Sequence, residues 1–226
     1  MRIISLLTQK GGAGKSTLTC NLAVAAMQAG EKVLALDLDH EQGTLSEWAK
    51  LRPEDKPPVP VAQLPGGDSR QLGSVLDAAR DRFGLMLLDL PGRDSPLTHN
   101  AMSVADLCLV PLRPTRPDAL AIRKTVEALM IGKKRFAFIL NQCPPAHNAR
   151  SAEMSAGLVS LGYLADPMIC MRAAFQDAYA AGQGVTEYEP DGKAAAEIRR
   201  LWKWIDQQTK NMAAPEVIEE RKQARA

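Results

Sequence analysis

The sequence predicts a doubly wound α/β fold, in which a mostly parallel β-sheet carries helices on both of its faces. Five short, almost entirely apolar segments are typical of strands buried on both sides. They cover residues 3–7, 33–38, 85–90, 107–112 and 136–140. Segments with helical patterning separate them, and this alternation forms parallel sheets through right-handed crossovers. With 46% hydrophobic residues, the 226-residue chain can also bury a sizeable core.

Helix signals support this alternation. Segment 16–29 is followed by Gly30, a residue type that often ends a helix. Segment 117–131 begins with a proline, which suits the first turn of a helix. A later segment, 194–208, carries its large apolar residues at helical spacing, and we expect that stripe to pack on the sheet.

The chain reads as one domain with a charged tail. Residues 52–68 hold five prolines and two glycines, which predicts a loop or an edge excursion. The excursion is no domain linker, because strands and helices resume after it. We therefore expect a single domain over residues 1–213. Residues 214–226 are charged and poor in apolar side chains, so we expect them to be frayed or helical at the surface.

Composition excludes several classes of protein. The formal net charge of +2 argues against a histone-like basic coat, so any nucleic-acid binding should come from a local patch. No apolar run is long enough to span a membrane, and the N-terminal segment lacks a signal-peptide cleavage region. We expect reduced thiols and a cytoplasmic location, because the cysteines lack disulfide-framework or metal-site spacing. These cysteines are Cys20, Cys108, Cys143 and Cys170.

A glycine-rich loop between the first strand and the first helix predicts a phosphate-binding site. Glycines let a backbone turn tightly and direct its N–H groups at phosphate oxygens, and the helix N-terminus adds a favourable dipole. In such a P-loop, Lys15 would bridge the β- and γ-phosphates and the Ser16 hydroxyl would bind Mg²⁺. The expected nucleotide contacts are Gly11, Gly12, Ala13, Gly14, Lys15, Ser16 and Thr17.

Carboxylates follow two of the predicted strands. Asp37 and Asp39 end the second strand, and alternation places them on the same side of it. Asp89 ends a strand of four apolar residues, which is the pattern of a Walker B aspartate that lies near Mg²⁺ through water. Because ligands gather at the carboxyl ends of strands in doubly wound sheets, we expect these three side chains to face the P-loop.

The loop resembles a known variant of the P-loop. Gln9 stands where the usual motif has its first glycine, and a second lysine, Lys10, appears. The pattern KGGxGKS over residues 10–16 resembles the deviant Walker A motif of the ParA/MinD family. This resemblance implies an ATP-dependent sandwich dimer in which Lys10 reaches the nucleotide of the partner. A cation beside its own positively charged loop also needs a compensating anion.

The resemblance extends over most of the chain and implies further roles. Segment 37–42 resembles switch I, so Asp39 would orient the attacking water and Asp37 would help to hold the Mg²⁺ hydration shell. The departure there is His40, where the family has proline; it is a second candidate for a base, although a loop histidine facing solvent is the simpler interpretation. Segment 91–94 resembles switch II, and Asn141 would meet the adenine or only cap its loop. Segments 171–175, 184–190 and 193–195 resemble the closing part of the family.

This resemblance implies a ParA-like ATPase that hydrolyses ATP slowly and is stimulated by a ParB-type adaptor. Such an ATPase would position or partition a plasmid, a chromosome or a protein cluster. No helix-turn-helix extension precedes the P-loop, as in the short ParA form. ParA relatives bind DNA non-specifically through surface cations, which would place this protein on the nucleoid. The candidate DNA contacts are Arg172, Lys193, Arg199, Arg200 and Lys203. A second basic group lies over residues 123–135, and solvated helix faces are the simpler interpretation of both groups.

Three other interpretations remain open at this point. A MinD-like, membrane-cycling ATPase would use an amphipathic helix, and Trp202 and Trp204 lie beside basic residues, but the tail 215–226 has too few apolar residues. An electron-transfer relative would need cysteines placed to bridge a cluster between subunits, which Cys20 and Cys108 do not suit. A scaffold without hydrolysis would not need the full set of Lys15, Ser16, Asp39 and Asp89.

Overall fold

The computed structural model describes residues 1–64, 68–145 and 149–210, and the predicted tail over 214–226 lies outside these residues. Seven strands form one sheet in the order β3-β2-β4-β1-β5-β6-β7, and every neighbouring pair is parallel. The predicted fold class is therefore confirmed. The strands are β1 (Arg2–Leu6), β2 (Val33–Asp37), β3 (Val61–Gln63), β4 (Leu85–Asp89), β5 (Leu107–Leu112), β6 (Phe136–Leu140) and β7 (Tyr163–Leu164).

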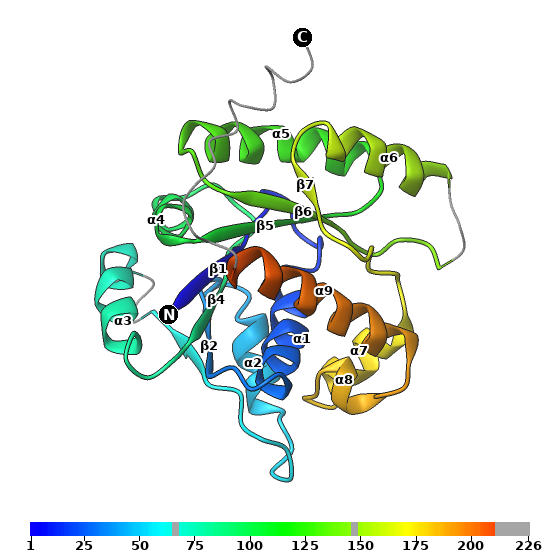
Figure 1. Ribbon diagram of the computed structural model, residues 1–226. Coiled ribbons are helices and arrows are strands. Elements are labelled where there is room, and N and C mark those ends of the chain that lie inside the picture. Colours follow the sequence, from blue (N-terminus) through cyan, green and yellow to red (C-terminus); the bar gives the residue numbers. More distant parts are fainter. Residues whose placement is uncertain (65–67, 146–148, 211–226) are drawn as a thin grey trace.

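Helices cover both faces of the sheet, as Figure 1 shows. One face carries α1 (Lys15–Gln28), α2 (Thr44–Lys50), α7 (Ala173–Ala180), α8 (Val185–Tyr188) and α9 (Lys193–Lys210). The other carries a short 3₁₀ turn (Ser69–Gln71), α3 (Leu72–Ala79), α4 (Pro96–Val104), α5 (Arg116–Ile131) and α6 (Ala149–Val159). In this part of the chain, none of the helices combines the length and apolarity needed to cross a bilayer.

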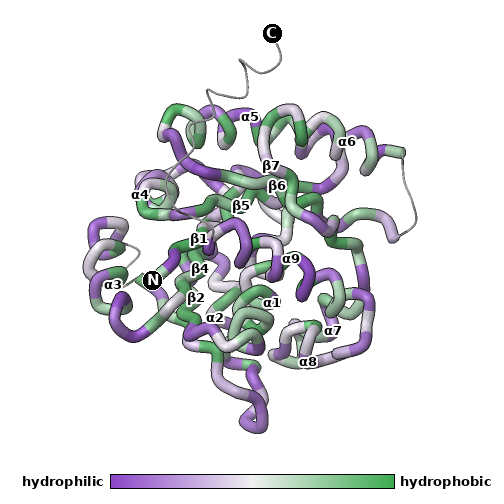
Figure 2. The backbone as a smooth tube through the Cα atoms, viewed as in Figure 1, coloured by the Kyte–Doolittle hydropathy of each residue, from purple (hydrophilic) through white to green (hydrophobic). Residues whose placement is uncertain are grey.

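The strands are buried on both sides, so their side chains divide between two cores. In β1, Ile4 and Leu6 point towards α1 and α9, whereas Ile3 points towards the opposite layer. Figure 2 shows the central strands as predominantly hydrophobic. The continuous apolar runs of the sequence therefore reflect a sheet with no solvent-facing side, which is the arrangement that the pattern predicts.

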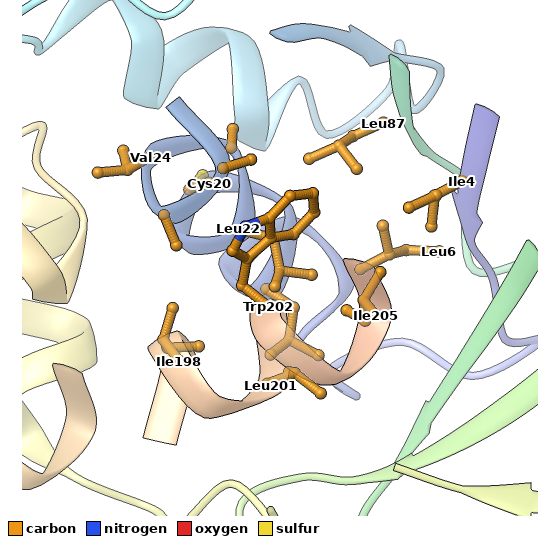
Figure 3. Close-up of a cluster of buried hydrophobic side chains, with 14 of the residues drawn as sticks. Ile4, Leu6, Cys20, Leu22, Val24, Leu87, Ile198, Leu201, Trp202 and Ile205 are labelled. Atoms are coloured by element: carbon orange, nitrogen blue, oxygen red, sulfur yellow. The ribbon is translucent and has the colours of Figure 1, made fainter. Parts of the chain in front are cut away.

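Helix α9 closes the first of these cores. Ile198, Leu201, Trp202 and Ile205 are buried, and Figure 3 shows them packed against Leu22 of α1 and the side chains of β1. The expectation that the apolar stripe packs on the sheet is confirmed. A membrane-surface role for this stripe is not compatible with its burial, because the same side chains cannot also insert into lipid.

The proline-rich excursion is tied to the domain. Its middle forms the edge strand β3, and Arg52 at its start is held by Glu187 of α8, with Nη2 and Oε1 2.8 Å apart and both side chains more than nine-tenths buried. The guanidinium also lies 5.3 Å from the centre of the Trp48 ring. A buried, hydrogen-bonded ion pair of this kind fixes the excursion against the helical layer.

Candidate functional site

The glycine-rich loop adopts the backbone that its sequence predicts. Gly12 and Gly14 have φ angles of 76° and 87°, in the left-handed region that favours glycine. A Cβ on Gly14 would also come within 2.3 Å of the Asn141 amide nitrogen. Within the described residues, no side chain caps α1 and its first turn holds no acidic residue. The N-terminus of α1 is therefore open to an anion.

The loop after β6 supports the glycine-rich loop from the side. The buried Asn141 donates its side-chain Nδ2 to the carbonyl of Ala13 at 2.8 Å, and Gln142 donates Nε2 to the carbonyl of Gly12 at 2.9 Å. Asn141 thus lies at the site, where it braces the P-loop. Its predicted contact with adenine stays a prediction, and Gln142 is a contributor that the sequence analysis missed.

Lys15 is buried among the predicted carboxylates. Only 8% of Lys15 is exposed, although it carries an amine. Burial lowers the pKa of Lys15, and the nearby charges of Asp89 and Asp39 act in the opposite direction. The fold therefore brings together one cation and two anions that the sequence assigned separately to the P-loop and to two strand ends.

Asp89 is the least satisfied polar group of the site. It pairs in register with Asp37 of β2 and with Leu6 of β1, and it is fully buried. Among the residues described, no group donates a hydrogen bond to either carboxylate oxygen. Burial raises the pKa of Asp89 to about 7. The Ser16 hydroxyl, which lies near the carboxylate without completing a hydrogen bond to it, and the charge of Lys15 oppose this rise, whereas the charges of Asp37 and Asp39 add to it. A buried carboxylate without a donor is suited to a cation or its bound water.

Asp37 differs from Asp89 although the two lie side by side. Its Oδ2 accepts hydrogen bonds from the backbone N–H and the hydroxyl of Ser46, at 2.9 and 2.7 Å. Its Oδ1 accepts from the backbone N–H of Asp39 at 3.1 Å. Asp37 therefore holds the turn into α2, and of the two carboxylates Asp89 is the one left free for a metal-bound water.

The turn after β2 sets the position of Asp39. The Asp39 carboxylate accepts from the backbone N–H of Gln42 at 3.3 Å, and its carbonyl accepts from that of Gly43 at 2.7 Å. Asp39 is half-buried and near enough to Lys15 to influence its charge. His40 is exposed, as expected for a loop histidine facing solvent.

The two loops on either side of the P-loop also contact each other. Arg93, in the segment after β4, forms an ion pair with Glu41 of the segment after β2. The same segment packs against the P-loop, because a Cβ on Gly92 would lie 3.3 Å from the backbone nitrogen of Gly11. Both ion-pair partners are exposed, so the pair adds little stability, but it links the two loops across the site.

Lys10 points to an anion within its own chain. Its ammonium donates to Oδ1 of Asp118, in the first turn of α5. The same carboxylate accepts from Arg113 through Nε at 2.8 Å and Nη2 at 3.1 Å. Burial alone would raise the pKa of Asp118, but hydrogen bonds from Arg113 and Lys10 hold it well below its usual value. The sequence predicts an anion near Lys10 but does not identify it as Asp118.

The candidate DNA contacts lie on or near α9, and their side chains differ in solvent exposure and in their contacts with other residues. Arg172 is partly buried against Glu197, Arg199 donates to the carbonyl of Pro190, and Arg200 forms an exposed ion pair with Asp166. Lys193 and Lys203 are exposed. Arg172 is therefore the least available of the five, whereas the others line the solvent side of α9.

Comparison with known proteins places this site in a family. The model of the CobQ/CobB/MinD/ParA nucleotide-binding domain matches residues 4–185. The chain belongs to this family. Its ParA and MinD members are P-loop ATPases, several of which act in positioning or partition, so the resemblance drawn from the motifs is confirmed.

Relatives of this chain include a carboxysome distribution protein and a chromosome-partitioning ATPase. The chain is 28% identical over 205 residues to maintenance of carboxysome distribution protein A of Halothiobacillus neapolitanus, which covers 86% of this chain and 91% of that one. It is 33% identical over 138 residues to the chromosome-partitioning ATPase Soj of Thermus thermophilus, across 50% of this chain and 55% of Soj. The fold also matches Pyrococcus furiosus MinD, with a TM-score of 0.72, 24% identity and coverage of 92% and 99%.

Proposed function

We propose that this chain is a ParA-type ATPase that forms a sandwich dimer in ATP, binds duplex DNA without sequence preference, and hydrolyses ATP to position or partition a cargo. The observation that carries the proposal is the position of the buried Lys15 close to Asp89, a buried carboxylate with no hydrogen-bond partner among the described residues, at the open N-terminus of α1. A buried cation and a buried anion at the end of a P-loop suit the binding of a nucleoside triphosphate and its metal ion.

The residues of the site divide the binding of Mg²⁺ and ATP between them. Lys15 would hold the β- and γ-phosphates, and the Ser16 hydroxyl and the water-mediated Asp89 carboxylate would hold Mg²⁺. Bound Mg²⁺ would neutralise charge that develops on the phosphates. In the part of the chain that the structure describes, no three acidic, histidine or cysteine side chains converge on a metal. Phosphate and water would therefore complete the coordination, as is usual for this ion.

Hydrolysis would depend on Asp39. Its place in the turn after β2, close to Lys15, suits a carboxylate that orients water towards the γ-phosphate. The turn is exposed at His40, and the exposed Glu41–Arg93 ion pair links it to the loop after β4. A catalytic turn with an exposed outer side fits slow turnover that an adaptor of the ParB type accelerates by ordering it.

Replacing Asp39 by alanine should separate binding from turnover. We expect Asp39→Ala to keep ATP and to dimerise, but to hydrolyse ATP about 100-fold more slowly, because water loses its orienting group. Phosphate release at saturating ATP measures this effect, and His40→Ala is the matched control one residue away. Wild-type turnover in Asp39→Ala together with a loss in His40→Ala would transfer the role to the histidine.

The kind of cargo is suggested by relatives and not by the site. One relative is named for maintaining carboxysome distribution and others for partitioning chromosomes. These names support a cellular cargo such as a plasmid, a chromosome or a protein cluster. A nucleoid location follows if the dimer binds DNA, because the nucleoid is then the surface on which it assembles.

DNA binding would use the solvent face of α9 near its N-terminal half. We expect the ATP-bound dimer to shift arbitrary duplex DNA, and the ADP-bound protein not to, because dimerisation doubles the phosphate contacts available to one duplex. Arg199→Glu/Arg200→Glu should weaken binding by about tenfold or more for all sequences alike and leave ATP binding intact. The binding should also fall steeply between two salt concentrations.

A mobility shift with unrelated DNA in a slowly hydrolysed ATP analogue measures this, beside vesicle sedimentation of the same sample. Arg80→Glu/Arg82→Glu is the matched charge-reversal control, because both arginines are exposed and follow α3, on the opposite face of the sheet from α9. Vesicle binding without DNA binding would replace the ParA-type proposal by the MinD-type alternative.

A further inference from the structure

The structure assigns to Asp118 the role of a docking carboxylate that holds Lys10 in the monomer, and from which Lys10 must detach before it reaches the nucleotide of a partner. The inference rests on the proposed ATP-dependent dimer. It adds a residue, and a competing contact, that regulate the formation of that dimer. Three observations carry it: the burial of Asp118, the number of its donors, and the position of Lys10 in the P-loop.

The environment of Asp118 favours the binding of cations to its carboxylate. Its side chain is only 2% exposed, yet its two oxygens accept from Lys10, from Nε and Nη2 of Arg113, and from the backbone N–H of Arg113 at 3.1 Å. It also lies in the first turn of α5, where the helix dipole favours a negative charge. Such a carboxylate competes well with a phosphate for a nearby ammonium group.

Lys10 can leave this carboxylate without leaving a buried charge unpaired. The Lys10 side chain is 30% exposed, so it is within reach of solvent, and the exposed Gly11 and Gly12 follow it in the chain. After Lys10 departs, Arg113 still donates three hydrogen bonds to Asp118. Loss of one member of a buried pair is costly when the other is left alone, and Arg113 prevents that here.

Two substitutions should therefore act in opposite directions. Asp118→Asn removes the charge that holds Lys10, so dimerisation should need about five- to tenfold less ATP. Arg113→Gln leaves Lys10 as the main cation of Asp118, so detaching Lys10 would expose a buried anion and dimerisation should need more ATP by a similar factor. A purely structural role for both residues would weaken dimerisation in both variants.

The experiment measures the ATP concentration for half-maximal dimerisation by light scattering, in the full chain with Mg²⁺. In parallel, amine labelling followed by mass spectrometry reports the accessibility of Lys10 in the ADP-bound protein, where Asp118→Asn should increase labelling several-fold. Asp106→Asn is the matched control, since Asp106 accepts a hydrogen bond from the backbone N–H of Ile3 at the opposite, N-terminal end of the neighbouring strands β1 and β5. If one variant fails to fold, the other still gives a signed result.

The outcomes separate this inference from the proposed function. Wild-type protein that stays monomeric in ATP contradicts the dimer itself. Wild-type protein that dimerises, with midpoints in Asp118→Asn and Arg113→Gln that are unchanged or shifted in the same direction, overturns the role of Asp118 and leaves the dimer standing.

Discussion

Lys15→Ala is expected to weaken ATP binding by about 100-fold, because a charge-assisted hydrogen bond in a buried site contributes up to about 3 kcal/mol. Lys15 is 8% exposed and close to Asp89 and Asp39, so solvent has little access with which to replace its contact with the phosphates. Alanine would also leave the two carboxylates without their nearby cation, which adds repulsion towards an anionic ligand.

Titration calorimetry with ATP and Mg²⁺ measures the loss. Lys50→Ala is the matched control, because Lys50 is an exposed lysine whose ion pair with Glu47 lies within α2. An affinity for ATP in Lys15→Ala equal to that of wild type would mean that the nucleotide binds elsewhere.

Asp89→Asn is expected to stabilise the nucleotide-free protein while it removes Mg²⁺-dependent ATP hydrolysis. The carboxylate is fully buried without a hydrogen-bond donor among the described residues, and its pKa rises to about 7. A carboxyl group whose pKa is higher in the folded protein than in the unfolded chain lowers the free energy of unfolding when it ionises. The cost therefore begins near the pKa of the unfolded chain, about 4, grows until about pH 7, and stays constant above it.

Thermal unfolding in EDTA at pH 5 and pH 8 tests this prediction. The variant should unfold several degrees higher than wild type at pH 8, and the difference should be smaller at pH 5. We expect a gain of about 1–2 kcal/mol in the free energy of unfolding at pH 8, and each kcal/mol shifts the unfolding temperature of a chain of this size by about 2–4 °C. Asp37→Asn is the contrasting control. It weakens the bonds from Ser46 and should lower the unfolding temperature. A variant at Asp89 that unfolds below wild type at pH 8 would contradict the burial argument.

The sequence predicted the fold well because its strongest signals are local. Continuous apolar strands, the glycines of the P-loop and the proline at the start of α5 each follow from periodicity or backbone conformation. Strand β7 was missed because two residues carry no periodicity, and β3 was hidden inside a proline-rich segment. Boundaries shifted by about one residue, as happens where helices and strands fray.

The site was predicted in its parts but not in its contacts. The motifs identified Lys15, Asp37, Asp39 and Asp89. Only the three-dimensional arrangement distinguishes Asp37, whose carboxylate accepts a hydrogen bond from Ser46, from Asp89, whose carboxylate has no hydrogen-bond partner in the described part of the chain. Asp118 was missed because it lies 108 residues from Lys10. In the sequence only the proline marked the start of this helix, and an aspartate in a first turn is ordinarily explained by the helix dipole and not by a contact with the P-loop.

The nucleotide-switched dimer is tested by the mass of the protein in solution with ATP and Mg²⁺, compared with ADP and Mg²⁺. Multi-angle light scattering with the hydrolysis-impaired Asp39→Ala should give a dimer in ATP and a monomer in ADP, because only the triphosphate would draw Lys10 away from Asp118 to the partner. The same mass in both nucleotides would contradict the nucleotide-switched dimer on which the proposed function depends.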